Sequence, residues 1–310
     1  MKKEDIERII KEIQKRMPAC EVKAETINKI GGTREAISCK FPSENYAVIL
    51  YPDDYQGLLD SGESPQNLGR YLTSQIEKRK DNLPIGPTTA EEFKKGLYIQ
   101  VINADINREL LESLPHDSME DIAIVARYQV PKDNGEFTSF LVTKDNMQEF
   151  QMSQGEVMEA AYKNTAAQEF CLHKPEDIMR EILQEQNIPE EAIDLYLSNT
   201  DSHLYMLTNR EQINGANALV CPEVLQNIYK EFGEPYYVLP SSTHELILAK
   251  DSSGLTQDEL RQMVQQVNVS SVTPDVLLSY NLFHYDGRKL SAVQEKEQVL
   301  EAARQHKLIH

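Results

Sequence analysis

The order of helix-type and strand-type segments limits the folds open to this chain more than any other feature of the sequence. Residues 3–17 carry isoleucines at helical spacing between charged side chains, which is typical of an amphipathic helix, and Pro18 ends it. Two strand-type segments follow at 22–30 and 35–41, joined through a Gly-Gly pair. Further on, helices and strands do not alternate strictly, and short turns join neighbouring strands. This pattern predicts an α+β fold with antiparallel or mixed sheets, several hairpins and packed amphipathic helices.

The rest of the chain continues the same mixture. Apolar patterns predict further strands at 46–51, 97–102, 122–130, 137–142, 204–207, 218–220, 236–239, 246–248, 282–285 and 289–293. They predict further helices at 65–80, 90–95, 107–114, 144–149, 154–163, 224–232, 256–267 and 295–306. The strands at 122–130 and 137–142 are joined by a strong hairpin signal, Lys132-Asp133-Asn134-Gly135.

The length of 310 residues suggests two domains or one large one. We expect an α+β region over 1–165, a helical connector over 166–200 and a second α+β region over 201–310, with one continuous unit as the alternative. Within the connector, Pro175 and Pro189 each stand near a helix start and are followed by acidic residues that suit a first turn.

Two ten-residue segments, 141–150 and 219–228, resemble each other. Both are predicted to close a strand and open a helix. One interpretation is that residues 125–150 and 203–228 form two similar strand–turn–strand–helix units. The alternative is coincidence, because short turns from strand to helix look alike.

The 50 acidic and 32 basic residues give the chain a formal charge of −18. Such a charge repels phosphate backbones and anionic lipid surfaces. The densest basic run, 78–80, is followed at once by Asp81 and is typical of a solvated helix end. We therefore expect no nucleic-acid partner. A protein partner stays open, and the sequence does not indicate an oligomeric state.

Membrane insertion and secretion are also not expected. The most apolar short run, 47–51, is far below the ~18 residues needed to span a bilayer. Charged residues fill the first positions of the chain, where a signal peptide keeps its apolar stretch. These features predict a soluble, cytoplasmic protein without a membrane partner.

Signatures of metal and cofactor binding are absent from the sequence. The cysteines form no CxxC pair, and scattered cysteines in a chain of this length fit reduced thiols in a cytosol: Cys20, Cys39, Cys171 and Cys221. The seven histidines form neither HxxxH nor HExxH, and no Walker or Rossmann glycine pattern occurs. We expect neither a metal nor a cofactor.

The segment 239–246 gathers two hydroxyls, an imidazole and a carboxylate into a predicted loop between strands. A Ser–His contact there would suit nucleophilic catalysis. The candidate catalytic residues are Ser241, Ser242, His244 and Glu245, with His203 as a helper. The alternative is a hydrogen-bonded connection that sets the strand register, because adjacent residues on a tight turn rarely aim at one point.

The same region carries a family resemblance. The string Tyr236-Tyr237-Val238-Leu239-Pro240-Ser241-Ser242-Thr243-His244-Glu245-Leu246-Ile247-Leu248 resembles the hallmark of a bacterial family, domain of unknown function 5688. The resemblance covers roughly residues 5 to 290 and includes the segments 49–55, 103–116, 153–165, 207–209 and 214–216. It implies a bacterial intracellular protein and assigns no activity or site residue, so the 239–246 segment can be a family-wide feature without being a site.

Three functional hypotheses follow. The leading one is a non-enzymatic cytoplasmic interaction or regulatory protein, because no nucleophile, metal or cofactor signature is present. The second is a hydrolase-type enzyme that uses Ser241 or Ser242 with His244, and the third is a small-molecule sensor without chemistry. A ligand would raise the stability of a sensor by mass action with no turnover.

Overall fold

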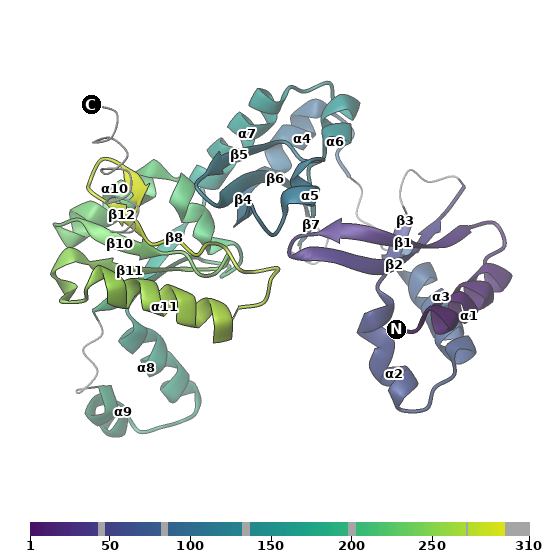
Figure 1. Ribbon diagram of the computed structural model, residues 1–310, viewed down its shortest axis with the longest axis horizontal. Helices are drawn as coiled ribbons and strands as arrows, with labels where there is room; N and C mark the ends of the chain where they lie inside the picture. The colour runs from purple at the N-terminus through teal and green to yellow at the C-terminus, as the bar shows by residue number, and fades with distance from the viewer. Residues whose placement is uncertain (43–46, 82–85, 132–136, 198–202, 271, 295–310) are drawn as a thin grey trace, which may run out of the picture. The chain divides into compact units, whose positions relative to one another are not determined.

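A computed structural model of the chain describes residues 1–42, 47–81, 86–131, 137–197, 203–270 and 272–294. It confirms the predicted α+β fold, with three sheets in which every described strand pairing is antiparallel (Figure 1). The contacts divide the chain into a first unit, 1–86 with 130–138, and a second unit, 87–129 with 139–310. The domain boundaries expected at 165 and 200 stay a prediction. The expected turn at 132–135 and the expected helix at 295–306 lie outside the described residues.

The first unit is a three-stranded sheet covered by helices. Its elements are α1 (Lys3–Arg16), β1 (Glu21–Lys29), β2 (Gly32–Lys40), β3 (Ala47–Leu50), a 3-10 turn η1 (Pro52–Tyr55), α2 (Gln56–Asp60) and α3 (Pro65–Asp81). The sheet order is β1-β2-β3. Gly31 and Gly32 hold positive φ angles of 89° and 135° at the β1–β2 turn, a backbone conformation open to glycine.

Helical spacing explains the core of the first unit. Ile9 and Ile13 stand one turn apart on α1 and are fully buried. Leu72 and Ile76 of α3 share the same core and are also fully buried, together with Ile37 of β2. The burial of these apolar side chains is the main stabilising term of the unit.

The second unit begins with a sheet of order β4-β6-β5, in which β7 also pairs with β6. Its elements are α4 (Ala90–Gly96), β4 (Leu97–Asn103), α5 (Arg108–Leu111), β5 (His116–Met119), β6 (Ile122–Pro131), β7 (Phe137–Leu141), α6 (Lys144–Glu149) and α7 (Gln154–Ala166). Helix α7 packs along β4. The strand β5 was not predicted, because its sequence His-Asp-Ser-Met has no apolar alternation.

The second sheet of this unit has six strands in the order β13-β12-β10-β11-β9-β8. Its elements are β8 (Phe170–His173), α8 (Pro175–Glu185), α9 (Glu190–Leu197), β9 (Leu204–Asn209), η2 (Gly215–Val220), α10 (Pro222–Phe232), β10 (Tyr236–Leu239), β11 (Leu246–Lys250), η3 (Asp251–Ser253), α11 (Gln257–Ser270), β12 (Phe283–Tyr285) and β13 (Leu290–Ala292). The segment expected to be wholly helical, 166–200, therefore contains the strand β8 as well as two helices.

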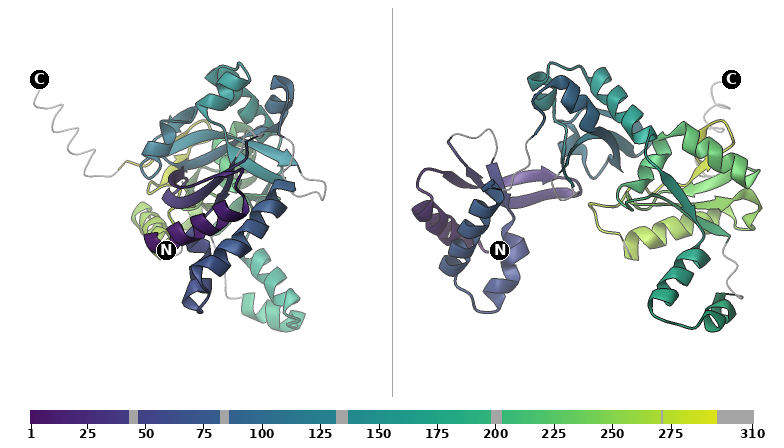
Figure 2. Two further views of the ribbon diagram at one scale, coloured as in Figure 1. Left: turned by 90° about the vertical axis from the view of Figure 1, so that its right-hand side faces the viewer. Right: turned by 180° about the vertical axis from the view of Figure 1, so that it is seen from behind.

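Helices α10 and α11 cover opposite faces of the six-stranded sheet. The Tyr236 hydroxyl donates to the carbonyl of Leu225 in α10, at 3.0 Å. The hydroxyl of the next residue, Tyr237, accepts from the side chain of Gln257 in α11, at 3.1 Å. Because successive side chains of a strand point to opposite faces, the two helices enclose the sheet between them (Figures 1 and 2).

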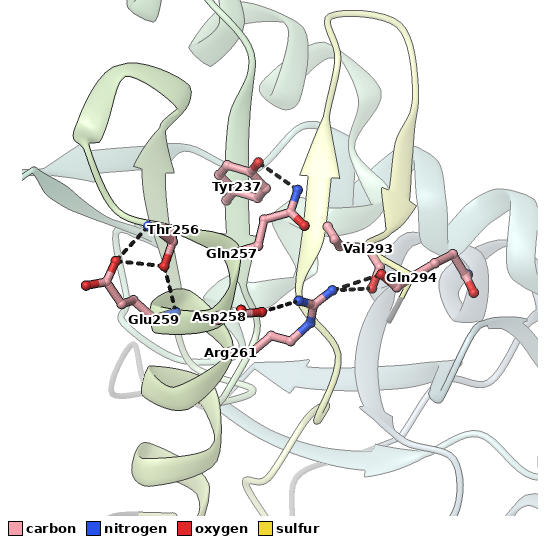
Figure 3. Close-up of polar contacts among 8 residues, drawn as sticks. All are labelled: Tyr237, Thr256, Gln257, Asp258, Glu259, Arg261, Val293 and Gln294. Atoms are coloured by element: carbon pink, nitrogen blue, oxygen red, sulfur yellow. Dashed lines mark hydrogen bonds and ion pairs between the residues drawn. The ribbon is translucent and has the colours of Figure 1, made fainter. Parts of the chain in front are cut away.

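The first turn of α11 is fixed by reciprocal hydrogen bonds (Figure 3). The Thr256 hydroxyl accepts from the Glu259 backbone N–H at 3.3 Å, and the Glu259 carboxylate accepts from the Thr256 backbone N–H at 2.8 Å. One turn on, Arg261 donates to the carbonyls of Val293 and Gln294 at 3.2 and 3.0 Å. These last contacts tie α11 to the chain that leaves β13.

The strand expected at 218–220 and the internal repeat are both wrong. Residues 215–220 form the 3-10 turn η2 instead of a strand, because a short apolar run does not by itself distinguish a strand from a buried turn. β9 pairs with β8 and β11, whereas β6 pairs with β4, β5 and β7. The two proposed units differ in strand pairing, and only 141–150 runs from a strand into a helix, so the similarity of 141–150 and 219–228 does not reflect a structural repeat.

A capping box at the start of α7 makes stability depend on pH. The Glu156 carboxylate accepts from the Ser153 backbone N–H (2.9 Å) and hydroxyl (2.8 Å), and these bonds lower the pKa of Glu156. The contribution of the Glu156 carboxylate to the free energy of unfolding is present above the unfolded pKa of about 4.3. It is lost as the pH falls through the lower folded pKa. We expect Glu156→Gln to flatten the fall in melting temperature between pH 5 and pH 3.

The matched control is Glu159→Gln, which changes an exposed acid within the same helix. It should leave the pH dependence of the melting temperature as in the parent chain. If the melting temperatures of the two variants depended on pH in the same way, the role assigned to Glu156 would be contradicted.

Candidate functional site

The 239–246 segment connects β10 to β11 and is held by backbone hydrogen bonds on two sides. The Thr243 N–H donates to the Val276 carbonyl at 2.8 Å, and the Thr243 carbonyl accepts from the Ala216 N–H at 3.2 Å. The Ser241 carbonyl accepts from the Leu278 N–H at 3.2 Å. Ser241, Ser242 and Thr243 are all buried. The segment is therefore an ordered connection that joins three parts of the second unit.

The side chains of Ser242 and His244 are both used within this connection. The Ser242 hydroxyl accepts from the His244 backbone N–H at 3.0 Å. The Nδ1 atom of the half-buried His244 ring accepts from the Asn214 backbone N–H at 3.2 Å. In a neutral ring this arrangement leaves the proton on Nε2.

The five sequence-predicted residues do not form a bonded catalytic group among the described residues. No hydrogen bond joins the His244 ring to either serine hydroxyl in the part of the chain that the structure describes. His203 is exposed just before β9, and Glu245 is partly buried beside His244. The assignment of Ser241, Ser242, His244 and Glu245 as catalytic residues stays a prediction.

Gly215 lets the loop before α10 pack closely on this connection. A Cβ atom at Gly215 would lie 2.3 Å from the Thr208 hydroxyl and 2.4 Å from the His244 carbonyl. The same hydroxyl donates to that carbonyl at 2.8 Å. Any side chain at Gly215 would break this contact, so glycine is required there for close approach.

A chain of polar side chains continues from Asn214 into the first sheet of the unit. The Asn214 side-chain carbonyl accepts from Gln100 at 3.2 Å, and the Gln100 carbonyl accepts from Arg127 at 2.8 Å. Arg127 also donates to the hydroxyl of Ser139 at 2.8 Å. All its partners among the described residues are neutral, and its buried Nε lacks a partner there. These bonds tie the loop at Asn214 to β4 and β6.

Asn217, from the adjacent turn η2, pairs with the outer edge of β4 as a strand would. Its side-chain carbonyl accepts from the Val101 N–H at 3.1 Å, and its amide donates to the Ile99 carbonyl at 2.5 Å. The Thr165 hydroxyl accepts from the Ile99 N–H at 2.7 Å, and Asn164 donates to the Leu97 carbonyl at 2.7 Å. Side chains therefore satisfy an edge that would otherwise be open to another strand.

The helical hairpin α8–α9 presents the second candidate surface. Both helices extend away from the six-stranded sheet in two views (Figures 1 and 2). We define the hairpin surface by its five exposed large apolar side chains: Met179, Ile182, Ile188, Leu195 and Tyr196. Their exposed fractions range from 38% to 73%, and α8 has no buried residue. An amphipathic helix normally buries its apolar face, so this one is unusual.

Ion pairs hold the two helices of the hairpin together. The Arg180 guanidinium of α8 donates to the carboxylates of Glu190 and Asp194 in α9, the latter at 2.7 Å. The hydrogen bond with Asp194 is the main cause of the raised pKa of Arg180. Gln184 adds a bond to Glu190 at 3.1 Å. These bonds join α8 directly to α9.

The sequence contained the signal for this surface, although the segment was interpreted as a connector. Ile178, Met179, Ile182 and Leu183 follow helical spacing after Pro175. That spacing predicts an amphipathic helix but does not say whether its apolar face meets the core. The exposure of Met179 and Ile182 is information that only the folded chain supplies.

The described ranges lack a cluster of metal ligands and a membrane-spanning helix. No three His, Cys, Asp or Glu side chains there lie close enough to hold a metal ion. No helix described is long and apolar enough to cross a bilayer. Burial raises the pKa of the Cys39 thiol to about 12 and that of Cys221 to about 11. Both stay protonated at neutral pH, and a protonated thiol is a poor nucleophile.

Comparison with known proteins identifies a family. A family model described as a family of unknown function, DUF5688, matches residues 3–287. No curated protein and no solved structure matches the chain.

Asn217→Ala should strongly destabilise the second unit. It would leave the Ile99 carbonyl and the Val101 N–H buried without their partners, at a cost of about 2 to 4 kcal/mol in total. Urea unfolding measures this difference. The control, Asn67→Ala on the exposed side of α3, should change the unfolding free energy by less than about 0.5 kcal/mol. Equal effects of the two substitutions would contradict the edge-pairing role.

His244→Ala separates a structural role from a catalytic one. The substitution removes the acceptor of the Asn214 N–H, so we expect it to lower the unfolding free energy by about 1 kcal/mol and the melting temperature with it. His203→Ala, at an exposed position, should leave the melting temperature unchanged. Loss of a hydrolytic activity in His244→Ala at an unchanged melting temperature would instead support the hydrolase hypothesis.

Proposed function

The chain belongs to the DUF5688 family, a family of unknown function, and we propose that it is a non-enzymatic cytoplasmic protein that binds a protein partner through the α8–α9 hairpin. Four free cysteines, three of them buried, suit a reducing compartment. The apolar hairpin surface supplies the binding site. The bacterial origin that the family resemblance implies forms part of the same proposal.

The hairpin surface is the single observation that carries the proposal. Five of the twelve exposed large apolar side chains in the described ranges lie within residues 175–197. Each Å² of apolar surface removed from water contributes roughly 25 cal/mol. Concentrating such surface on a projecting element, with none of α8 buried, favours its burial against a second molecule.

The internal ion pairs of the hairpin support binding in a second way. Arg180 joins α8 to α9 through Glu190 and Asp194, so the surface is pre-organised. A pre-organised surface loses less conformational entropy on binding than a segment that must first fold. Surface ion pairs add little to stability, so their use here is geometric.

The double substitution Met179→Ser with Ile182→Ser tests the proposal. We expect native mass spectrometry of the chain gently purified from its host to show a protein complex, and the double variant to lose at least about 90% of it. The melting temperature should stay within about 2 °C, because both side chains are partly exposed.

Val269→Ser is the matched control, since Val269 is a helical residue with 87% exposure elsewhere in the second unit. It should leave the complex intact. A complex that survives in the double variant, or a chain that carries only a small molecule, would contradict the proposal. The latter result would favour the sensor hypothesis.

A further inference from the structure

The chemistry of the hairpin also specifies the kind of partner, and this inference rests on the proposed function. We infer that the partner presents a cationic amphipathic helix, with apolar residues on one face and Lys or Arg beside them. The argument depends on the charge around the apolar side chains, the way the one cation of the hairpin is used, and the spacing of the apolar side chains.

The hairpin is much more acidic than the chain as a whole. Residues 175–197 hold seven acidic side chains and one basic side chain, a formal charge of −6 in 23 residues. The complete chain has −18 in 310 residues. A third of the net charge is therefore concentrated around the hairpin surface.

The single basic residue of the hairpin, Arg180, does not offset the negative charge on its surface. Arg180 forms ion pairs with Glu190 and Asp194 inside the hairpin. Within the described ranges, Glu181 and Glu185 of α8 form no ion pair, and both are exposed. A partner would meet an apolar surface bordered by uncompensated negative charge.

The combination of apolar side chains and negative charge favours some binding partners over others. A symmetric dimer formed through this surface would place two hairpins of −6 against each other, and like charges oppose that contact. A partner with Lys or Arg gains favourable contacts and faster association.

The spacing of the apolar side chains suits a helical partner. Met179 and Ile182 are three residues apart on α8, so they lie on one side of the helix. A helix that docks on such a row presents its own apolar residues at i, i+3, i+4 and i+7. A basic residue on the flank of that stripe would then reach Glu185, which follows Ile182 at i+3 on the same side of α8.

Fluorescence anisotropy with a synthetic probe tests the inference on the full chain. The probe is an 18-residue peptide of Leu and Lys, with Leu at i, i+3, i+4 and i+7. We expect it to bind, and Met179→Ser with Ile182→Ser to raise its Kd at least about tenfold. Raising NaCl from 50 to 300 mM should weaken binding about tenfold, since exposed charges are screened.

Charge variants and control peptides complete the test. Glu181→Gln with Glu185→Gln should raise the Kd about threefold and reduce its salt dependence. The matched control, Glu4→Gln with Glu7→Gln on α1, changes two exposed acids of the first unit and should leave the Kd unchanged. A scrambled Leu/Lys peptide and a Leu/Glu peptide should each bind at least about tenfold more weakly.

Three outcomes would each overturn the inference. The scrambled or Leu/Glu peptide could bind as tightly as the probe, the two charge variants could have equal effects on the Kd, or the probe could fail to bind. If the host complex still depends on Met179 and Ile182 in that case, the proposed function stands and only the cationic helix is wrong. A homodimer that depends on the hairpin would identify a second copy of the chain as the partner and would overturn the inference of a cationic helical partner. Loss of both the probe and the complex would remove the proposed function as well.

Discussion

The pairing of the Asn217 carboxamide with β4 is the contact on which the arrangement of the second unit depends. One side chain satisfies an N–H and a carbonyl of a buried strand edge, at 3.1 and 2.5 Å. Unsatisfied groups at such an edge cost free energy and invite another strand. Because Asn217 stands between β9 and α10, this contact joins the chain of the six-stranded sheet to β4, together with the bonds of Gln100 to Asn214 and of Asn103 to the Leu278 carbonyl.

The 239–246 segment contacts the same turn, η2, that carries Asn217. Its backbone bonds to Ala216 and Leu278, and the Asn103 side chain donates to the Leu278 carbonyl at 3.0 Å. His244 receives the Asn214 N–H three residues before Asn217. The Ser242 hydroxyl and the His244 ring thus each accept a backbone N–H, as short polar side chains in turns commonly do.

Local features of the fold could be predicted from the sequence. The isoleucines of α1 follow one helical face, and the Gly-Gly pair marks the β1–β2 turn, because both signals act between near neighbours. The strand β5 and the turn η2 could not be predicted, since their conformation depends on distant contacts. Asn217 meets Ile99 and Val101 at separations of 118 and 116 residues, and no local pattern encodes such a partner.

The candidate sites could likewise be predicted from the sequence only in part. The hydroxyls and imidazole at 241–244 were visible in the sequence, but their hydrogen-bond partners were not. The apolar spacing of α8 was equally visible, but whether it meets the core is decided by where the chain places β8 and β9 around it. The proposed function rests on what the fold leaves exposed, namely the surface of Met179, Ile182 and their neighbours.

Site-specific photo-cross-linking in the host tests most directly whether the hairpin surface is a binding site. A photoreactive amino acid would replace Ile182 in one strain and Val269 in another, two exposed helical positions of the second unit. The account predicts one defined protein adduct from position 182 and none from position 269. Equal adducts from both positions, or none from position 182, would contradict it.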